Sequence, residues 1–217
     1  MTKIVTLTMN PALDIATSTG EIIPNRKLRC DTPRYDPGGG GINVARAVHS
    51  LGVDALAVFP TGGSAGDLIG DLLHQEGVEY SAIPITGFTR ENLNVVERGS
   101  GAQYRFVLPG PEIAGDDQQR CLDELAAAAA DATYIVASGS LPPGVPEDFY
   151  RRVAELAKQL GKRLVLDTSG AALESAGSGI YLLKPSLSGL ESLAGRPIRD
   201  ERAEEQAARE LIEQGRC

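Results

Sequence analysis

The stretch Asp36-Pro37-Gly38-Gly39-Gly40-Gly41-Ile42-Asn43-Val44-Ala45-Arg46-Ala47 runs four glycines directly into a helical pattern. Apolar residues recur at helical spacing up to Leu51, and Gly52 ends the pattern, so we predict a helix over residues 43–51. A helix N-terminus presents free N–H groups, and glycines let another group touch the backbone. The stretch is therefore a candidate ligand-binding turn, although an ordinary tight turn with Asn43 near the cap fits the same residues.

Composition and charge narrow the class of protein. The 217 residues suffice for one large domain, or for one domain with a small appendage, and the net charge of −8 argues against a nucleic-acid-binding surface. Cys30, Cys121 and Cys217 are far apart with no CxxC spacing, which predicts reduced thiols in a cytoplasmic protein. No secretory leader and no apolar run of membrane-spanning length is apparent, so we expect no membrane partner.

Strand and helix patterns alternate along most of the chain. We predict strands over residues 4–9, 55–60, 80–85, 133–137, 163–166 and 180–183, and further helices over residues 65–76, 116–131, 146–160, 171–175 and 200–214. This alternation implies right-handed βαβ crossovers and a mostly parallel sheet. His49 and His74 lie on predicted helices without metal-ligand spacing, so we expect surface or packed imidazoles.

Two segments interrupt the alternation, and both resemble antiparallel β ribbons. In the first, we expect a strand and a turn over residues 22–27 and an exposed strand over 28–35. In the second, residues 93–98 and 103–108 form a predicted hairpin. We expect the ribbons to pair into one small antiparallel sheet that needs a partner, either the main domain or a second subunit. The predicted organisation is an α/β core of residues 1–10, 37–86 and 111–217, with a β lid of residues 11–36 and 87–110.

Polar residues follow several predicted core strands, at Asn10 to Asp14, Ser138 to Ser140, Asp167 to Gly170 and Lys184 to Ser186. The carboxyl ends of parallel strands open on one edge of a sheet, where small molecules bind. Asp14 is expected in the loop beyond Pro11, where it fits either an acceptor for hydroxyl groups or a plain turn residue.

The ribbons add four cations, Lys27, Arg29, Arg90 and Arg105. Guanidinium groups bind phosphate in a forked geometry, so cations on a lid suit a phosphorylated ligand, although solvated strand faces explain each of them equally well. The sequence has no Walker A pattern and no GxGxxG, which argues against a P-loop enzyme and a dehydrogenase.

Ordered motifs along the whole chain resemble the PfkB branch of the ribokinase-like sugar kinases. They are Thr-Met-Asn-Pro-Ala-Leu-Asp (8–14), the glycine stretch (37–46), Gln-Tyr-Arg-Phe-Val-Leu-Pro-Gly (103–110), Ser-Gly-Ser-Leu-Pro-Pro-Gly (138–144) and Leu-Asp-Thr-Ser-Gly (166–170). Within that branch, the four-glycine turn and the Gln-Tyr-Arg-Phe strand favour the minor-type 6-phosphofructokinases. The resemblance implies a three-layer sandwich with a β lid that pairs two subunits into a homodimer.

The resemblance also implies a reaction, the transfer of the ATP γ-phosphoryl group to the 1-hydroxyl of fructose 6-phosphate with Mg²⁺, as in glycolysis. By position, it implies sugar contacts from Asp14, Gly39, Asn43 and Ser138, and contacts to the 6-phosphate from Lys27, Arg90 and Arg105, one of them possible from the partner's lid. It further implies nucleotide contacts from Lys184 and Ser186 and an outer-shell metal role for Asp167.

Two departures from the family pattern stand out. The family's Lys-Pro-Asn, with a Glu three residues after the Asn, is here Lys184-Pro185-Ser186, and Gly189 stands at the Glu position. The Gly-Ala-Gly-Asp motif, whose Asp is the family's general base, is expected beyond Cys217. We therefore expect little or no kinase activity from this chain alone.

Alternatives remain open at this point. Tagatose-6-phosphate kinase and 1-phosphofructokinase share nearly the same site, and turnover on the three sugar phosphates separates them. A non-catalytic module that binds a sugar phosphate or dimerises is the alternative of another class, and calorimetry without ATP discriminates it.

Overall fold

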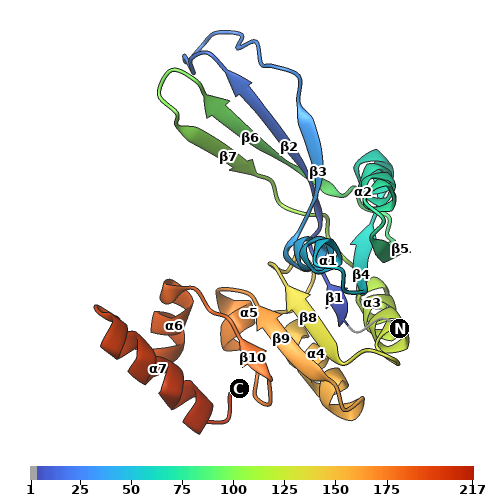
Figure 1. Cartoon of the computed structure of the whole chain (residues 1–217), viewed down its shortest axis with the longest axis vertical. Helices are drawn as coiled ribbons and strands as arrows, with labels where there is room; N and C mark the ends of the chain where they lie inside the picture. Colours follow the sequence, from blue (N-terminus) through green and yellow to red (C-terminus); the bar gives the residue numbers. More distant parts are fainter. Residues whose placement is uncertain (1–3) are drawn as a thin grey trace.

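The larger of two sheets confirms the predicted parallel α/β core. The computed structural model describes residues 4–217, so the first three residues of the predicted core lie outside it (Figure 1). All pairings in this sheet are parallel, in the order β10-β9-β8-β1-β4-β5. Its strands are β1 (Ile4–Leu7), β4 (Ala55–Thr61), β5 (Glu79–Pro84), β8 (Tyr134–Ser138), β9 (Arg163–Asp167) and β10 (Leu182–Leu183).

Helices cover both faces of this sheet, which confirms the three-layer sandwich. Helices α1 (Gly40–Ser50) and α2 (Gly63–Gln75) pack on one face around buried Phe59. On the other face, α3 (Gly115–Ala128) and α4 (Phe149–Gln159) enclose the main cluster, in which burial raises the pKa of the Cys121 thiol to about 12. Each fully buried large side chain contributes about 1.5–3 kcal/mol.

The C-terminal part adds α5 (Ala171–Glu174), α6 (Leu187–Ala194) and α7 (Glu201–Glu213). Helix α6 is absent from the sequence prediction. It begins where Ser186 Oγ accepts the Gly189 N–H at 3.2 Å, and it ends at Gly195 in the left-handed conformation. Among residues 4–217, no helix is both long and apolar enough to cross a membrane.

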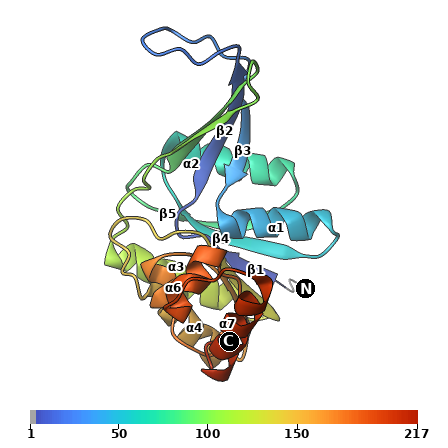
Figure 2. The ribbon, with the colours of Figure 1, turned by 90° about the vertical axis from the view of Figure 1, so that its left-hand side faces the viewer.

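The smaller sheet, which we call the lid sheet, extends away from the core in both views (Figures 1 and 2). Its order is β3-β2-β6-β7, from β2 (Ala12–Thr19), β3 (Arg34–Gly38), β6 (Arg90–Glu97) and β7 (Gln103–Val107). The two ribbons are antiparallel, but β2 and β6 pair in parallel, so the sheet is mixed and not antiparallel as predicted. The reason is geometric, since β2 follows β1 along the sequence and β6 follows β5. Because β1 and β5 are parallel core strands, both segments leave the core at the same edge and run in the same direction.

Three local predictions are wrong. Asp14 lies within β2 and not in a loop, because the chain bends over residues 8–11 and pairs again from Ala12. Residues 22–27 form no strand, and β3 begins only at Arg34, so residues 20–33 are a loop. Helix α1 begins at Gly40, three residues before the predicted start, which places Asn43 inside the helix.

The glycine turn presses its backbone against the ends of core strands. Gly39 precedes α1 with φ of 119°, a conformation that favours glycine, and a Cβ there would lie 2.5 Å from Thr8 Cγ2. A Cβ at Gly41 would lie 2.6 Å from Leu7 O. The close approach lets Thr8 Oγ1 accept the Ile42 N–H at 2.8 Å, which satisfies a donor that the helix itself leaves unpaired.

Gly41→Ala tests this close approach. We expect a loss of stability of about 1–3 kcal/mol, because the added methyl group overpacks a rigid backbone contact. Gly115 is the matched control, since it also lies in the first turn of a helix, with nothing within 4 Å of an added Cβ. Gly115→Ala should leave stability unchanged or raise it by less than about 1 kcal/mol. Urea denaturation of both variants checks this, and equal effects would contradict the packing argument.

The lid tip carries a carboxylate that joins two loops. Glu97 accepts hydrogen bonds from Ser100 Oγ and, at 2.7 Å, from the Ile22 N–H. These bonds, first that from Ser100 and then that from Ile22, lower the pKa of Glu97 below its ordinary value of 4.5. Because the pKa of Glu97 is lower in the folded chain than in the unfolded chain, its hydrogen bonds contribute fully to stability at pH values above the unfolded pKa. This contribution is lost as the pH falls through the folded pKa.

We therefore expect the Ile22 amide to lose protection from hydrogen exchange at pH values below 4.5. In Glu97→Gln, the Ile22 amide should exchange faster at neutral pH, and its protection should depend little on pH. Glu91→Gln, at an exposed position of the same strand, should behave as the unsubstituted chain. The measurement is amide exchange by NMR over a pH series, expressed as a protection factor relative to the intrinsic rate at each pH. A protection factor of the Ile22 amide that does not change with pH in the unsubstituted chain would refute this role of Glu97.

Candidate functional site

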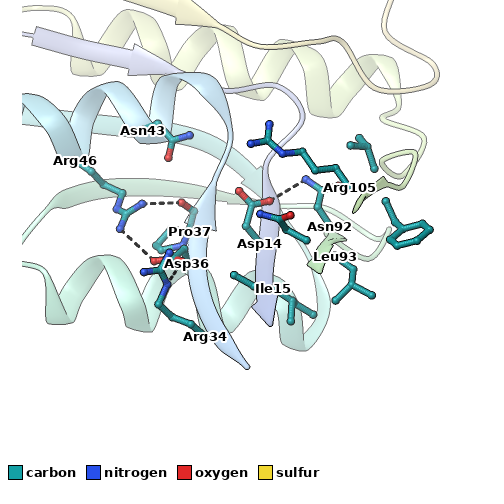
Figure 3. A pocket seen from close by; sticks show the side chains of 14 residues that line it. Asp14, Ile15, Arg34, Asp36, Pro37, Asn43, Arg46, Asn92, Leu93 and Arg105 are labelled. Carbon is teal, nitrogen blue, oxygen red and sulfur yellow. Dashed lines mark hydrogen bonds and ion pairs between the residues drawn. The ribbon is translucent and has the colours of Figure 1, made fainter. Parts of the chain in front are cut away.

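A cavity of about 580 Å³ lies where the lid sheet meets α1, within the size range of small-molecule sites (Figure 3). Cross-strand rows of the lid sheet form its wall. One row is Asp36, Asp14, Asn92 and Val107, and the next on the same face is Arg34, Ala16, Asn94 and Arg105. Because successive strand residues point to opposite faces, the side chains of the intervening row, Tyr35, Ile15, Leu93 and Phe106, are directed to the other face, although Ile15, Leu93 and Phe106 also border the cavity.

Asp14 stands at the centre of this wall. Its Oδ1 accepts a hydrogen bond from Asn92 Nδ2 at 2.9 Å, and Asn92 belongs to the neighbouring strand in register (Figure 3). On its other side, a Cβ at Gly38 would overlap the carboxylate, so only glycine leaves room for Asp14 there. The carboxylate is thus held between two strands beside the cavity.

Arg46 fastens the glycine turn to the neighbouring helix. Its Nε and Nη2 each lie 2.6 Å from a carboxylate oxygen of Glu76, the residue directly after α2. Its Nη1 donates to Pro37 O at 3.2 Å, and Nη2 lies 3.8 Å from Asp36 Oδ1 (Figure 3). The hydrogen bonding to Glu76 raises the pKa of Arg46. The end of β3 is therefore tied to both helices of this face.

The predicted phosphate-binding cations do not all meet at the cavity. Arg105 lines it, on β7. Arg90 instead donates from Nη1 to Leu108 O at 3.1 Å and from Nη2 to Asn10 O at 3.0 Å, and so it joins the connections by which the chain leaves and re-enters the core. Burial lowers the pKa of Arg90, against the effect of Asp14. Lys27 is exposed in the loop at the lid tip and is not among the lining residues.

Three of the four predicted polar strand ends, those that begin at Ser138, Asp167 and Lys184, meet at a second, smaller hollow of about 280 Å³, and residues 10–14 do not line it. Lys184 Nζ lies 3.1 Å from Asp167 Oδ1, and Ser138 Oγ lies 3.4 Å from Asp167 Oδ2. Gly40 adjoins Ser138 so closely that a Cβ would overlap its hydroxyl. Remaining lining residues are Gly139, Ser140, Thr168, Ser169 and Ser186. The start of α1 thus lies beside the hollow, and Asn43 of the same helix lines the larger cavity.

The donor set at this edge limits how a metal ion fits. Within residues 4–217, no three or more His, Cys, Asp and Glu side chains come together as a metal cluster. Asp167 contributes one carboxylate, and Lys184 pairs with it. Since Mg²⁺ is often held by one or two carboxylates together with substrate phosphates, Asp167 fits an ion that arrives with a nucleotide.

Several cavity residues are absent from the sequence prediction, namely Arg34, Asp36, Arg46, Asn92 and Asn94. A signal for the asparagines exists in the sequence, because Asn92 and Asn94 are two apart on a predicted strand and so share a face. Their place beside Asp14 depends on the parallel pairing of β2 with β6, which the sequence pattern does not predict.

Comparison with known proteins assigns the family. Residues 7–216 match the pfkB family carbohydrate kinase, so the chain belongs to that family.

Individual relatives are similar over the whole of this chain. The ATP-dependent 6-phosphofructokinase isozyme 2 of Mycobacterium tuberculosis is 52% identical over 215 residues, which are 99% of this chain and 63% of the relative. Two solved structures of phosphofructokinase-2 from Escherichia coli, the tetrameric inhibited form and the complex with fructose-6-phosphate, each have a TM-score of 0.93 at 40% identity and cover 100% of this chain. The chain covers 71% and 72% of these two proteins.

Arg46→Gln tests the tie between the glycine turn and α2. We expect a loss of stability of about 1–2 kcal/mol, because hydrogen bonds to a charged group in a partly buried place are broken. The control is Arg209→Gln, which breaks an exposed pair with Glu205 on α7 and should cost less than about 0.5 kcal/mol. Equal losses in urea denaturation would show that the Arg46 pair behaves as an ordinary surface pair.

Proposed function

We propose that this chain forms the sugar-phosphate-binding part of an ATP- and Mg²⁺-dependent 6-phosphofructokinase, which converts fructose 6-phosphate to fructose 1,6-bisphosphate. The observation that carries the proposal is the cavity in which Asp14 and Arg105 share a wall formed by the lid sheet. A carboxylate accepts hydrogen bonds from sugar hydroxyls, and a guanidinium binds a phosphate group. A phosphorylated sugar carries hydroxyls and a phosphate, so a site that binds it needs both kinds of group.

The sugar would lie between the lid sheet and α1. Asp14 and Asn43, which line the cavity, are proposed to hold its hydroxyls, with Ser138 in the smaller hollow. Gly39 lines neither space, and its backbone at the start of α1 is proposed as a further contact. Arg105 is proposed to hold the 6-phosphate. Arg90 could reach that phosphate only by giving up its hydrogen bonds to the carbonyls of Asn10 and Leu108. We therefore propose that it supports the cavity by holding these two segments.

The nucleotide would approach through the smaller hollow. Lys184 and Ser186 are proposed to contact its phosphates, and Asp167 the water shell of the Mg²⁺ that accompanies them. ATP supplies the transferred phosphoryl group. Enzymes of this chemistry work mainly by positioning the reactants and by neutralising charge, and the residues of this chain serve those two purposes.

The lid sheet is proposed to pair two subunits. Its face opposite the cavity carries large apolar side chains that are exposed in the single chain, among them Tyr35, Leu93, Tyr104 and Phe106. Exposed apolar patches commonly mark protein–protein contacts. In such a dimer, the loop that bears Lys27 would reach the partner's cavity. This would explain why Lys27 does not line the cavity of its own subunit.

Isothermal titration calorimetry with fructose 6-phosphate, without ATP, tests the proposal. We expect binding with one site per chain, and Arg105→Ala and Asp14→Ala should each weaken it by about 10- to 100-fold, because a hydrogen bond to a charged group is lost in each. Fructose 1-phosphate and tagatose 6-phosphate serve as comparison ligands.

The controls separate the possible outcomes. Arg209→Ala, on the remote helix α7, should bind as the unsubstituted chain does. A coupled assay with ATP and Mg²⁺ should give little turnover. No heat of binding with fructose 6-phosphate would overturn the proposal, and tighter binding of either comparison ligand would replace the substrate it names.

A further inference from the structure

Asn92 occupies the position directly beside Asp14 in the lid sheet. The two residues are register partners across β2 and β6 and lie on the cavity face of the sheet. Asn92 is also the register partner of Val107 on β7, so its side chain lies between the strand that bears Asp14 and the strand that leads back to the core.

Both ends of the Asn92 amide are engaged. Its Nδ2 donates to Asp14 Oδ1 at 2.9 Å, and its Oδ1 accepts the N–H of Leu108 at 3.3 Å. The carbonyl of Leu108 is in turn held by Arg90. The carboxylate of Asp14 only accepts hydrogen bonds and the Leu108 N–H only donates one, so together they place the NH₂ group towards Asp14 and the amide oxygen towards Leu108. The orientation of the amide is therefore set by these two contacts.

This fixed amide determines how Asp14 presents its carboxylate. Oδ1 is committed to Asn92, while Oδ2 lies over Gly38, where no side chain crowds it. Among residues 4–217, the structure gives Oδ2 no hydrogen-bond donor. One oxygen is thus used to orient the group, and the other remains available to a ligand.

We propose that Asn92 is a positioning residue that orients Asp14 for a sugar hydroxyl. The inference rests on the proposed function of the cavity, and it adds a residue that does not itself touch the sugar. A carboxylate that is held by a charge-assisted hydrogen bond needs no reordering when the ligand arrives, so removal of the donor should weaken binding.

Asn94 provides a matched comparison. It lies two residues along the same strand, on the same face, and it borders the same cavity. Its register partners are Ala16 and Arg105, and its buried Oδ1 has no hydrogen-bond partner among the described residues. Alanine at either position removes the same amide from the same wall, but only Asn92→Ala frees Asp14.

The experiment measures the affinity for fructose 6-phosphate by calorimetry in Asn92→Ala, Asn92→Asp and Asn94→Ala. We expect Asn92→Ala to weaken binding about 10-fold or more, and Asn94→Ala to weaken it by clearly less. Asn92→Asp keeps an acceptor for the Leu108 N–H but places a carboxylate against Asp14. It should weaken binding at least as much as Asn92→Ala, and it serves as the second variant if the alanine variant does not fold.

The outcomes separate this inference from the function on which it rests. Failure of the unsubstituted chain to bind fructose 6-phosphate would overturn the proposed function. Binding by the unsubstituted chain with equal losses in Asn92→Ala and Asn94→Ala would overturn the role of Asn92 alone. Full affinity in Asn92→Asp would do the same, because that variant retains the contact with Leu108 but replaces the donor to Asp14 by a second carboxylate oxygen.

Discussion

The close approach of the four-glycine turn to the ends of the core strands is the constraint on which the rest of the site depends. Each glycine faces a different neighbour: Gly38 faces Asp14, Gly39 faces Thr8, Gly40 faces Ser138 and Gly41 faces Leu7. A Cβ at Gly39, Gly40 or Gly41 would push the turn away from the core, and one at Gly38 would displace Asp14 of the lid sheet. With the turn in place, Thr8 caps the Ile42 N–H, and α1 begins between the larger cavity and the smaller hollow. Lid, core and helix therefore meet at one backbone segment.

The lid sheet gains its function from strand alternation and from where its strands leave the core. One face carries the polar rows with Asp14, Asn92 and Arg105, while the other carries exposed apolar side chains. A sheet of this size buries little on its own, so its position depends on ties at its base. Arg90 joins the two connecting segments through their carbonyls, and Arg46 holds the end of β3 to α2. These arginines stabilise the geometry in which a ligand is held.

Periodicity and turn residues were enough to predict the parallel core, the hairpin of β6 and β7 and most of the polar strand ends, because each depends on local sequence, whereas the strands of the first ribbon were misplaced. The parallel pairing of β2 with β6 was not predictable in this way, since it depends on which edge of the core releases each strand. The same pairing places Asn92 beside Asp14, so the positioning residue was missed with it. The role of a single side chain is equally hard to predict, as Arg90 shows. Its charge and position suit a phosphate, yet its guanidinium donates hydrogen bonds to two backbone carbonyls.

The most direct test of the account is an amide NMR titration of the chain with fructose 6-phosphate. We place the ligand where lid and core meet, so resonances of Asn43, of the residues around Asp14 and Arg105, and of Gly39 at the start of α1 should shift together along one binding curve. The neighbouring signal of Ser138 should follow the same curve. Shifts confined to the groove between α6 and α7, with an unchanged glycine turn, would contradict the account.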